Sequence, residues 1–78
     1  KVKLRRANLH NADLRRAKLN GADLRKVDLS GANLSGADLR KSRLTKAHVS
    51  RADMHGTDLR KANVRGTDLK SAKGVSNT

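Results

Sequence analysis

Two copies of a five-residue unit follow each other in the stretch Ala32-Asn33-Leu34-Ser35-Gly36-Ala37-Asp38-Leu39-Arg40-Lys41. Leu, Val or Met recurs at every fifth position, 14 times in succession, and a small residue stands two positions before each. We call these positions the large column and the small column. The chain has 78 residues and no aromatic residue, so we expect the large column to form the core. The large column comprises Leu4, Leu9, Leu14, Leu19, Leu24, Leu29, Leu34, Leu39, Leu44, Val49, Met54, Leu59, Val64 and Leu69.

A five-residue period excludes a simple helix and a simple strand. In an α-helix, successive large residues would be rotated by about 140° and would form no stripe. On a flat strand they would alternate between the two faces, because five is an odd number. A short extended segment followed by a corner, always turning in the same direction, keeps both columns inside. The repeat therefore predicts an all-β fold, a parallel β-helix or β-solenoid.

The residue before each large residue predicts how many units form one coil. If coils stack, residues one coil apart become cross-strand neighbours, for which opposite charges are favourable. An offset of 20 residues gives four pairs of opposite charge and one pair of like charge. An offset of 15 residues gives three pairs of opposite charge and five pairs of like charge. The opposite pairs are Lys3–Asp23, Asp23–Arg43, Lys18–Asp38 and Asp53–Lys73, and the like pair is Asp38–Asp58. This favours four units per coil, a square cross-section and about 3.5 coils in all, spaced roughly 4.8 Å apart.

Each corner is expected at the two residues that follow a large residue. Gly occupies the second of these positions at residues 21, 31, 36, 56 and 66, which fits the third position of a type II turn. Arg or Lys often occupies the same position, so we expect a different turn geometry at those corners. Gly74 stands where the next large residue would be. We therefore expect the solenoid to comprise residues 1–73, followed by a tail over residues 74–78.

The four faces of such a tube differ in charge. The first basic face, residues 2–6, 22–26, 42–46 and 62–66, has a net charge of +7. The second basic face adjoins it, comprises residues 17–21, 37–41 and 57–61 with Lys1, and carries +4. The other two faces carry 0 and +1, although stacked like charges repel. The predicted anion-binding residues are Lys3, Arg5, Arg6, Arg25, Lys26, Arg43, Lys46 and Arg65 on the first face, and Arg40, Lys41, Arg60 and Lys61 on the second.

No group of residues predicts catalysis, a metal site or a cofactor. His48 is expected to stack between Asp28 and Asp68, but structural metal sites need three or four convergent ligands. Asp38 and Asp58 are expected to stack on a convex wall without a cleft. No Cys is present, so thiolate chemistry and disulfides are excluded.

Two sets of polar residues have structural roles in this interpretation. The recurring Asp or Asn before the large residue is expected to satisfy nearby backbone groups. Ser42, Thr57 and Thr67 occupy the small column, where their hydroxyls are expected to bond corner carbonyls. Neither set predicts a binding site for a small molecule.

The units Ala7-Asn8-Leu9, Ala12-Asp13-Leu14, Ala22-Asp23-Leu24 and Ala52-Asp53-Met54 resemble the motif of the pentapeptide repeat proteins, Ala-(Asp/Asn)-Leu-X-X. The resemblance covers about nine-tenths of the chain and implies a right-handed quadrilateral β-helix with four units per coil. It implies little about activity, since most members have none assigned. Members of the quinolone-resistance type present an acidic surface to DNA gyrase or topoisomerase IV and dimerise through a C-terminal helix. This chain is basic and lacks an aromatic-rich C-terminal module, which argues against DNA mimicry.

The net charge of +12 makes an anionic partner the central functional expectation. We expect a non-enzymatic interaction module or scaffold whose basic side docks on an anionic macromolecule, nucleic acid before an acidic protein surface. Without aromatic residues or a helix to enter a groove, contacts would be to phosphates and independent of sequence. The alternatives are a purely structural or protein-docking spacer within a larger protein, and a topoisomerase-binding DNA mimic.

The location and surroundings of the tube complete these expectations. No apolar run is long enough to span a membrane and no signal peptide is visible, so we expect a cytoplasmic location. The chain begins at Lys1 in the middle of a unit, and neither end of the tube has a visible cap. We therefore expect end-to-end association or more protein on one or both sides.

Overall fold

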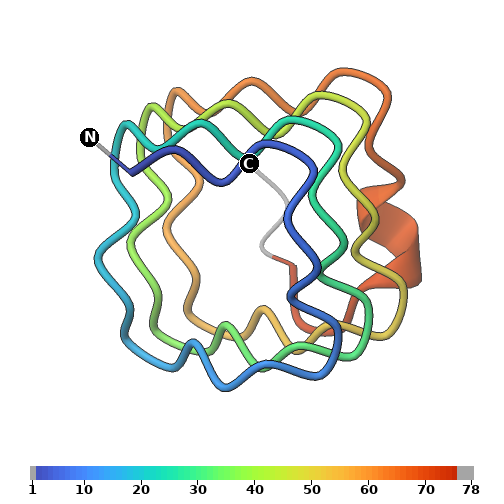
Figure 1. Cartoon of the computed structure of the whole chain (residues 1–78). Coiled ribbons are helices and arrows are strands. Elements are labelled where there is room, and N and C mark those ends of the chain that lie inside the picture. The colour runs from blue at the N-terminus through green and yellow to red at the C-terminus, as the bar shows by residue number, and fades with distance from the viewer. Residues whose placement is uncertain (1, 76–78) are drawn as a thin grey trace.

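The computed structural model describes residues 2–75, which wind into stacked coils with a square outline (Figure 1). Single residues of neighbouring coils pair as isolated parallel bridges, and the partners are always 20 residues apart. The offset predicted from the charge pairs is therefore confirmed, and all five of those pairs are bridged. The bridges are Lys3–Asp23, Asn8–Asp28, Asp13–Asn33, Lys18–Asp38, Asp23–Arg43, Asp28–His48, Asn33–Asp53, Asp38–Asp58, Arg43–Asn63 and Asp53–Lys73.

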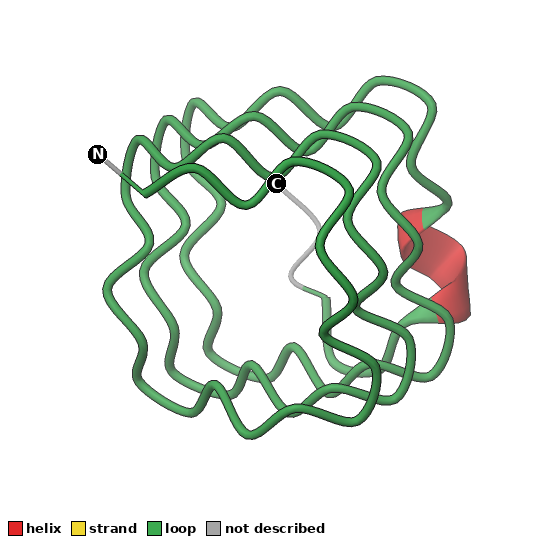
Figure 2. Cartoon of the chain, viewed as in Figure 1, coloured by secondary structure: helices red, strands yellow, loops and turns green. Residues whose placement is uncertain are grey.

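Backbone hydrogen bonds join each coil to the next around these bridges. The amide of Leu4 donates to the carbonyl of Asp23 at 2.8 Å, and the amide of Asp23 donates to the carbonyl of Val2 at 2.9 Å. At the corner, the amide of Arg6 donates to the carbonyl of Arg25 at 2.9 Å. Only one residue per unit is bridged, so residues 2–75 contain no continuous strand (Figure 2). The expected extended segments are this short because a corner interrupts the pairing in every unit.

All corners between Leu4 and Ala72 are closed by the same hydrogen bond, from a small-column amide to the preceding large-column carbonyl. At 13 corners the second corner residue has a positive φ, as a type II turn requires. The expectation of another geometry at non-Gly corners is wrong. Their φ lies between 57° and 62°, because the same corner bond closes every unit and holds the same turn, whichever residue occupies it. These residues are Arg6, Asn11, Arg16, Lys26, Lys41, Lys46, Arg51 and Lys61.

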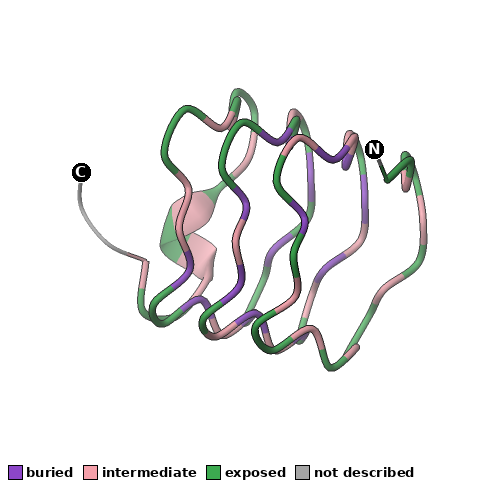
Figure 3. Ribbon diagram, turned by 90° about the vertical axis from the view of Figure 1, so that its left-hand side faces the viewer, coloured by how far each residue is buried: buried purple, intermediate pink, exposed green. Residues whose placement is uncertain are grey.

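The large and small columns fill the tube, as expected. Leu24, Leu29, Leu34, Leu39 and Leu44 are completely buried in the middle coils. Large residues of the first and last coils are only partly buried, and Figure 3 shows burial concentrated between the two ends. Burial of one such Leu contributes about 1.5–3 kcal/mol, so the middle of the tube dominates the stability.

The three hydroxyl residues of the small column bond inward-facing carbonyls, which confirms the prediction made for them. Ser42 Oγ donates to the Leu39 carbonyl at 2.7 Å. Thr57 Oγ1 donates to the Leu34 carbonyl at 2.7 Å, and Thr67 Oγ1 donates to that of Leu44. Within the described residues no buried side-chain nitrogen or oxygen lacks a partner, so the polar substitutions of the small column are tolerated without an unpaired group.

One side of the last coil leaves the ladder at the 3₁₀-helix η1, Leu69–Ser71, drawn red in Figure 2. Asp68 caps η1 and accepts from the amide of Lys70 at 3.2 Å, and it makes no bridge. His48 therefore pairs with Asp28 only, and the expected stacking of His48 against Asp68 is wrong. The ladder resumes at Lys73. Lys1 and residues 76–78 of the expected tail lie outside the described residues.

No membrane-spanning helix is found in residues 2–75, since none is long and apolar enough.

Candidate functional site

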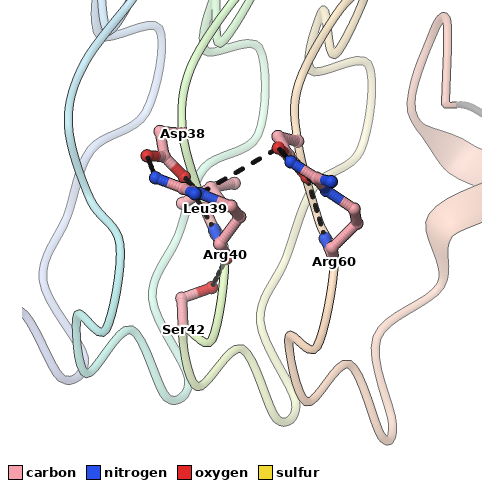
Figure 4. A network of polar contacts seen from close by, with 6 residues as sticks. Asp38, Leu39, Arg40, Ser42 and Arg60 are labelled. Carbon is pink, nitrogen blue, oxygen red and sulfur yellow. Dashed lines mark hydrogen bonds and ion pairs between the residues drawn. The ribbon is translucent and has the colours of Figure 1, made fainter.

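Outward Asp and Arg residues of the same unit bind each other in a fork. Arg40 donates from Nε to Asp38 Oδ1 at 2.8 Å and from Nη2 to Oδ2 at 2.7 Å (Figure 4). Similar forks join Asp13–Arg15, Asp23–Arg25 and Asp58–Arg60. Residues two positions apart on extended backbone share a face, so the Asp-Leu-Arg triplet brings the two charges together. These forks within a unit were not predicted, because the charge pairs considered from the sequence join different coils.

The recurring Asp or Asn also binds the backbone, as predicted. Its Oδ1 accepts a hydrogen bond from the amide two residues later, which orders the first corner residue. This bond occurs at ten units: Asn8, Asp13, Asp23, Asp28, Asn33, Asp38, Asp53, Asp58, Asn63 and Asp68.

The forks hold the carboxylates in their charged form. Hydrogen bonds from Arg15 lower the pKa of Asp13 to about 2, and those from Arg40 lower the pKa of Asp38 to about 2. Arg60 also lowers the pKa of Asp58 below its usual value. A general acid needs a raised pKa, so the stacked acids Asp38 and Asp58 do not form an acid–base pair. Arg40 Nε lies 4.0 Å from Asp58 Oδ2, which links the two coils.

The predicted anion-binding residues all lie on the outside of the tube. Eleven are exposed, and Arg25 is half-buried. The forks of Arg25, Arg40 and Arg60 compensate three of these charges locally. Within residues 2–75, none of the other nine lies within 4 Å of a carboxylate, namely Lys3, Arg5, Arg6, Lys26, Arg43, Lys46, Arg65, Lys41 and Lys61. The ladder therefore brings these unpaired charges together on two adjoining faces.

Five of the unpaired cations occupy corners with a positive φ. Arg6, Lys26 and Lys46 stack along one edge of the first basic face, which we call the outer edge. Lys41 and Lys61 stack along the edge between the two basic faces, which we call the shared edge. A positive φ costs a residue with a side chain about 1 kcal/mol, whereas Gly adopts it freely. The two remaining corner columns contain one cation each among the described residues, Arg16 and Arg51.

Shallow hollows flank the shared edge. One of about 620 Å³ is lined by Val2, Lys3, Asn20, Gly21, Asp23, Arg40, Lys41 and Arg43. A smaller one of about 280 Å³ is lined by Arg40, Lys41, Arg60 and Lys61. The larger hollow has no direct signal in the sequence, because Asn20 and Gly21 in its lining carry no charge. Hollows of similar size lie at other corners, so the unpaired Lys41 and Lys61, and not the hollows, make the shared edge the centre of the candidate site.

The histidines do not form a metal or catalytic site among residues 2–75, where no three metal-ligating side chains converge. His10 Nδ1 lies 2.9 Å from Ser30 Oγ, and Ser30 Oγ donates to Asp28. Ser30 stands between His10 and Asp28, whereas nucleophilic catalysis needs the His between the other two. His55 Nδ1 lies 2.7 Å from Asp53 Oδ1.

Comparison with known proteins agrees with this architecture. The profile of pentapeptide repeats matches the chain in eight copies, over residues 1–31 and 32–70. The chain is a member of the pentapeptide repeat family. Members of this family are structural repeat proteins that fold as right-handed quadrilateral β-helices. Among curated proteins, no match is found.

Solved pentapeptide repeat proteins resemble the chain over most of its length. Rfr23 from the cyanobacterium Cyanothece 51142 is 32% identical, covers 90% of the chain and has a TM-score of 0.68. The protein alr5209 from Nostoc Pcc 7120 is 37% identical, covers 83% of it and has a TM-score of 0.54. AT2G44920 from the Arabidopsis thaliana thylakoid lumen is 37% identical, covers 86% of the chain and has a TM-score of 0.47. The chain spans 52%, 62% and 50% of these proteins, respectively.

Proposed function

We propose that this pentapeptide repeat chain is a non-enzymatic binding module whose basic side docks on the phosphate backbone of nucleic acid. The observation that carries the proposal is the row of corner cations with positive φ. Lys26 and Lys46 on the outer edge, like Lys41 and Lys61 on the shared edge, occupy positions that Gly would fill with less strain. Strained residues tend to be kept where they serve function.

Electrostatic repulsion strengthens this argument. Lys41 and Lys61 stack one coil apart, and so do Lys26 and Lys46, at a spacing of roughly 4.8 Å. Two like charges at such a distance repel by about 1 kcal/mol in water. A polyanion lying along these columns would remove the repulsion and release counterions from its own phosphates.

The chemistry of the basic side favours nucleic acid over other anionic partners. No aromatic residue is available for base stacking, which disfavours single strands. Among residues 2–75 the exposed large apolar residue is Val2, which lies at the N-terminal end of the first basic face. A single Val is too little apolar surface for insertion into a membrane, so the basic side offers no apolar face for that purpose. Straight columns of Lys and Arg suit a regular array of phosphates, which they would bind without reading the bases.

Fluorescence anisotropy with a labelled duplex tests the proposal across 50–200 mM salt. The first variant replaces Lys26, Lys41, Lys46 and Lys61 by Gln, and the control replaces Arg16, Arg51, Lys70 and Lys73 by Gln. Each removes four charges. We expect the affinity of the first variant to fall and its salt slope to decrease by about 4, since each phosphate contact contributes about one. Equal losses in both variants, or no binding of duplex DNA or RNA by the unaltered chain at low salt, would refute docking on the basic side.

A structural or protein-docking spacer is the second candidate. It is favoured by the forks of Arg25, Arg40 and Arg60, which compensate part of the basic charge within the tube. Capture of one defined acidic protein after nuclease treatment would support it. The DNA-mimic type is disfavoured by the basic surface, and gyrase supercoiling that is unaffected by the chain would exclude it.

The setting of the module is part of the same proposal. We propose about 3.5 coils at roughly 4.8 Å each over residues 1–73, a tail outside the repeat over residues 74–78 and a cytoplasmic location. End-to-end association or a larger parent protein would cover the ends of the tube. Light scattering of the chain, and localisation of the full-length protein, test these points.

A further inference from the structure

The smaller hollow on the shared edge has an unusual lining. It is a shallow, open hollow lined by Arg40, Lys41, Arg60 and Lys61, two consecutive residues from each of two neighbouring coils. The amide of Lys41 donates to the carbonyl of Arg60 at 3.0 Å, so the two coils are joined at this point. Four cationic residues thus line about 280 Å³ of open surface, without another kind of residue in the lining.

The two guanidinium groups are held in place before any ligand arrives. Arg40 is fixed by Asp38, and Arg60 donates from Nε to Asp58 Oδ1 at 3.0 Å and from Nη2 to Oδ2 at 2.7 Å. Figure 4 shows the guanidinium groups of Arg40 and Arg60 on successive coils. Each fork uses Nε and Nη2, so Nη1 makes no hydrogen bond to residues 2–75. Rigid donors bind oxyanions at a smaller entropic cost than free side chains do.

The charges around the hollow favour an anion with more than one oxygen. Asp38 and Asp58 compensate the two arginines, whereas Lys41 and Lys61 have no carboxylate within 4 Å among the described residues. Two ammonium groups and the two free Nη1 groups can donate to several oxygens of one tetrahedral group.

We infer that the hollow between Arg40, Lys41, Arg60 and Lys61 is a seat for a single phosphate group. The inference rests on the proposed function, because the seat would hold one phosphate of the nucleic acid while the rest of the basic side contacts its neighbours. Lys41 and Lys61 supply the net charge. Arg40 and Arg60 orient the oxygens, and Asp38 and Asp58 act as positioning residues for them.

Titration of the ¹⁵N-labelled chain with inorganic phosphate, at constant ionic strength, tests the seat by NMR. We expect saturable shifts of the Arg40 and Arg60 Nε–H signals and of the Lys41 and Lys61 amides. Lys41→Gln with Lys61→Gln should weaken this binding by about tenfold or more, as loss of charge-assisted hydrogen bonds implies. The matched control is Arg16→Gln with Arg51→Gln, which removes the same charge from two other positive-φ corners and should leave the affinity unchanged. Thermal melts verify that both variants fold.

Titrations with three further ligands identify the source of the phosphate, and they distinguish the phosphate site from the proposed docking on nucleic acid. The ligands are a short duplex with a 5′-phosphate, the same duplex without it, and vesicles of phosphatidylcholine with phosphatidic acid. Saturation of the seat by either duplex supports a nucleic acid phosphate, and saturation by vesicles alone supports the seat but overturns its nucleic acid source. Shifts that spread over all cations without saturation overturn the seat, even if duplex binding persists. Saturation by inorganic phosphate without any duplex binding supports the seat and refutes the proposed function.

Discussion

The basic side and the opposite side of this tube share one backbone but differ at their edges. The opposite side comprises residues 7–16, 27–36, 47–56 and 67–75. Both sides have the same 20-residue bridges, the same corner bonds and Asp–Arg forks. At the corners, however, the basic side has five cations with positive φ beside Gly21 and Gly66, whereas the opposite side has two cations beside Gly31, Gly36, Gly56 and Asn11. Since Gly closes the same turn, the fold does not require the cations, and their excess on the basic side is the difference on which the proposed function rests.

The largest expected effect is a loss of stability on truncation of a buried Leu, which tests whether the core packs equally well on the two sides. Leu24 belongs to the basic side and Leu34 to the opposite side, and both are completely buried. Replacement of either by Ala should lower the free energy of unfolding by about 2–5 kcal/mol, measured in urea. The two losses should be similar. A much smaller loss for Leu24→Ala would mean that the sides differ in packing as well as in surface charge.

A Lys introduced at a Gly corner of the opposite side should show how much stability a cation with positive φ costs. A side chain at Gly56, where φ is +70°, would meet Gly36 N at an ordinary 3.6 Å. Gly56→Lys should therefore lower the free energy of unfolding by about 1 kcal/mol through the positive φ alone. Gly56→Asn, whose side chain tolerates this conformation better, should cost less in the same urea titration. Unchanged stability in both variants would show that the positive φ of the cations on the outer and shared edges is not strained.

The converse change should have a smaller effect on stability. Lys61→Gly relieves the positive φ but increases the entropy of the unfolded chain, and we expect a net gain of about 0.5 kcal/mol. Duplex affinity should fall at the same time. Arg51→Gly on the opposite side should give a similar gain while duplex binding is retained. Differential scanning calorimetry and anisotropy measure the two quantities, and a loss of stability at Lys61 would contradict the assigned strain.

The smallest expected difference between the two sides concerns the Asp–Arg forks. Acid should reduce their contribution to stability equally on the two sides. The pKa values of Asp13 and Asp38 are lowered from 3.8 to about 2 in the folded chain. Their contribution is therefore complete above the unfolded value and is lost as the pH falls towards 2. We expect the Tm to fall between pH 4 and pH 2. Asp13→Asn and Asp38→Asn should each make this fall shallower by the same amount, and a change confined to one variant would indicate unequal forks.

The inner layers could be predicted from the spacing of the large column, and their register from the charge pairs between coils. Members of the large column recur without interruption, and charge pairs such as Lys3–Asp23 and Asp53–Lys73 indicate the 20-residue offset. The prediction that the large residues point inward needed only the periods of helices and strands.

The corners and forks were harder to predict for a different reason. Propensity disfavours a positive φ at Lys41 or Lys46, but stacking of identical turns overrides propensity. The forks depend on contacts within a unit, and their signal is the Asp-Leu-Arg triplet, as at Asp38–Arg40. Nothing in the sequence around η1 indicates a break, since Thr67 and Leu69 fit the repeat. In the structure, the Thr67 hydroxyl accepts from the amide of Ala47 and donates to the Leu44 carbonyl.

The 20-residue register also limits how a tube of this kind can change in length. Insertion or deletion of four whole units would leave every later residue on its original side, so the basic side would simply become longer or shorter. Loss of a single unit, for example residues 32–36, would keep the hydrophobic columns intact but rotate everything after it by one face. Lys41 and Lys61 would then no longer lie above Gly21, and the basic side would be divided. Lineages that retain the charged surface should therefore gain and lose repeats in multiples of four, whereas lineages that use the tube only as a spacer are free to change by one.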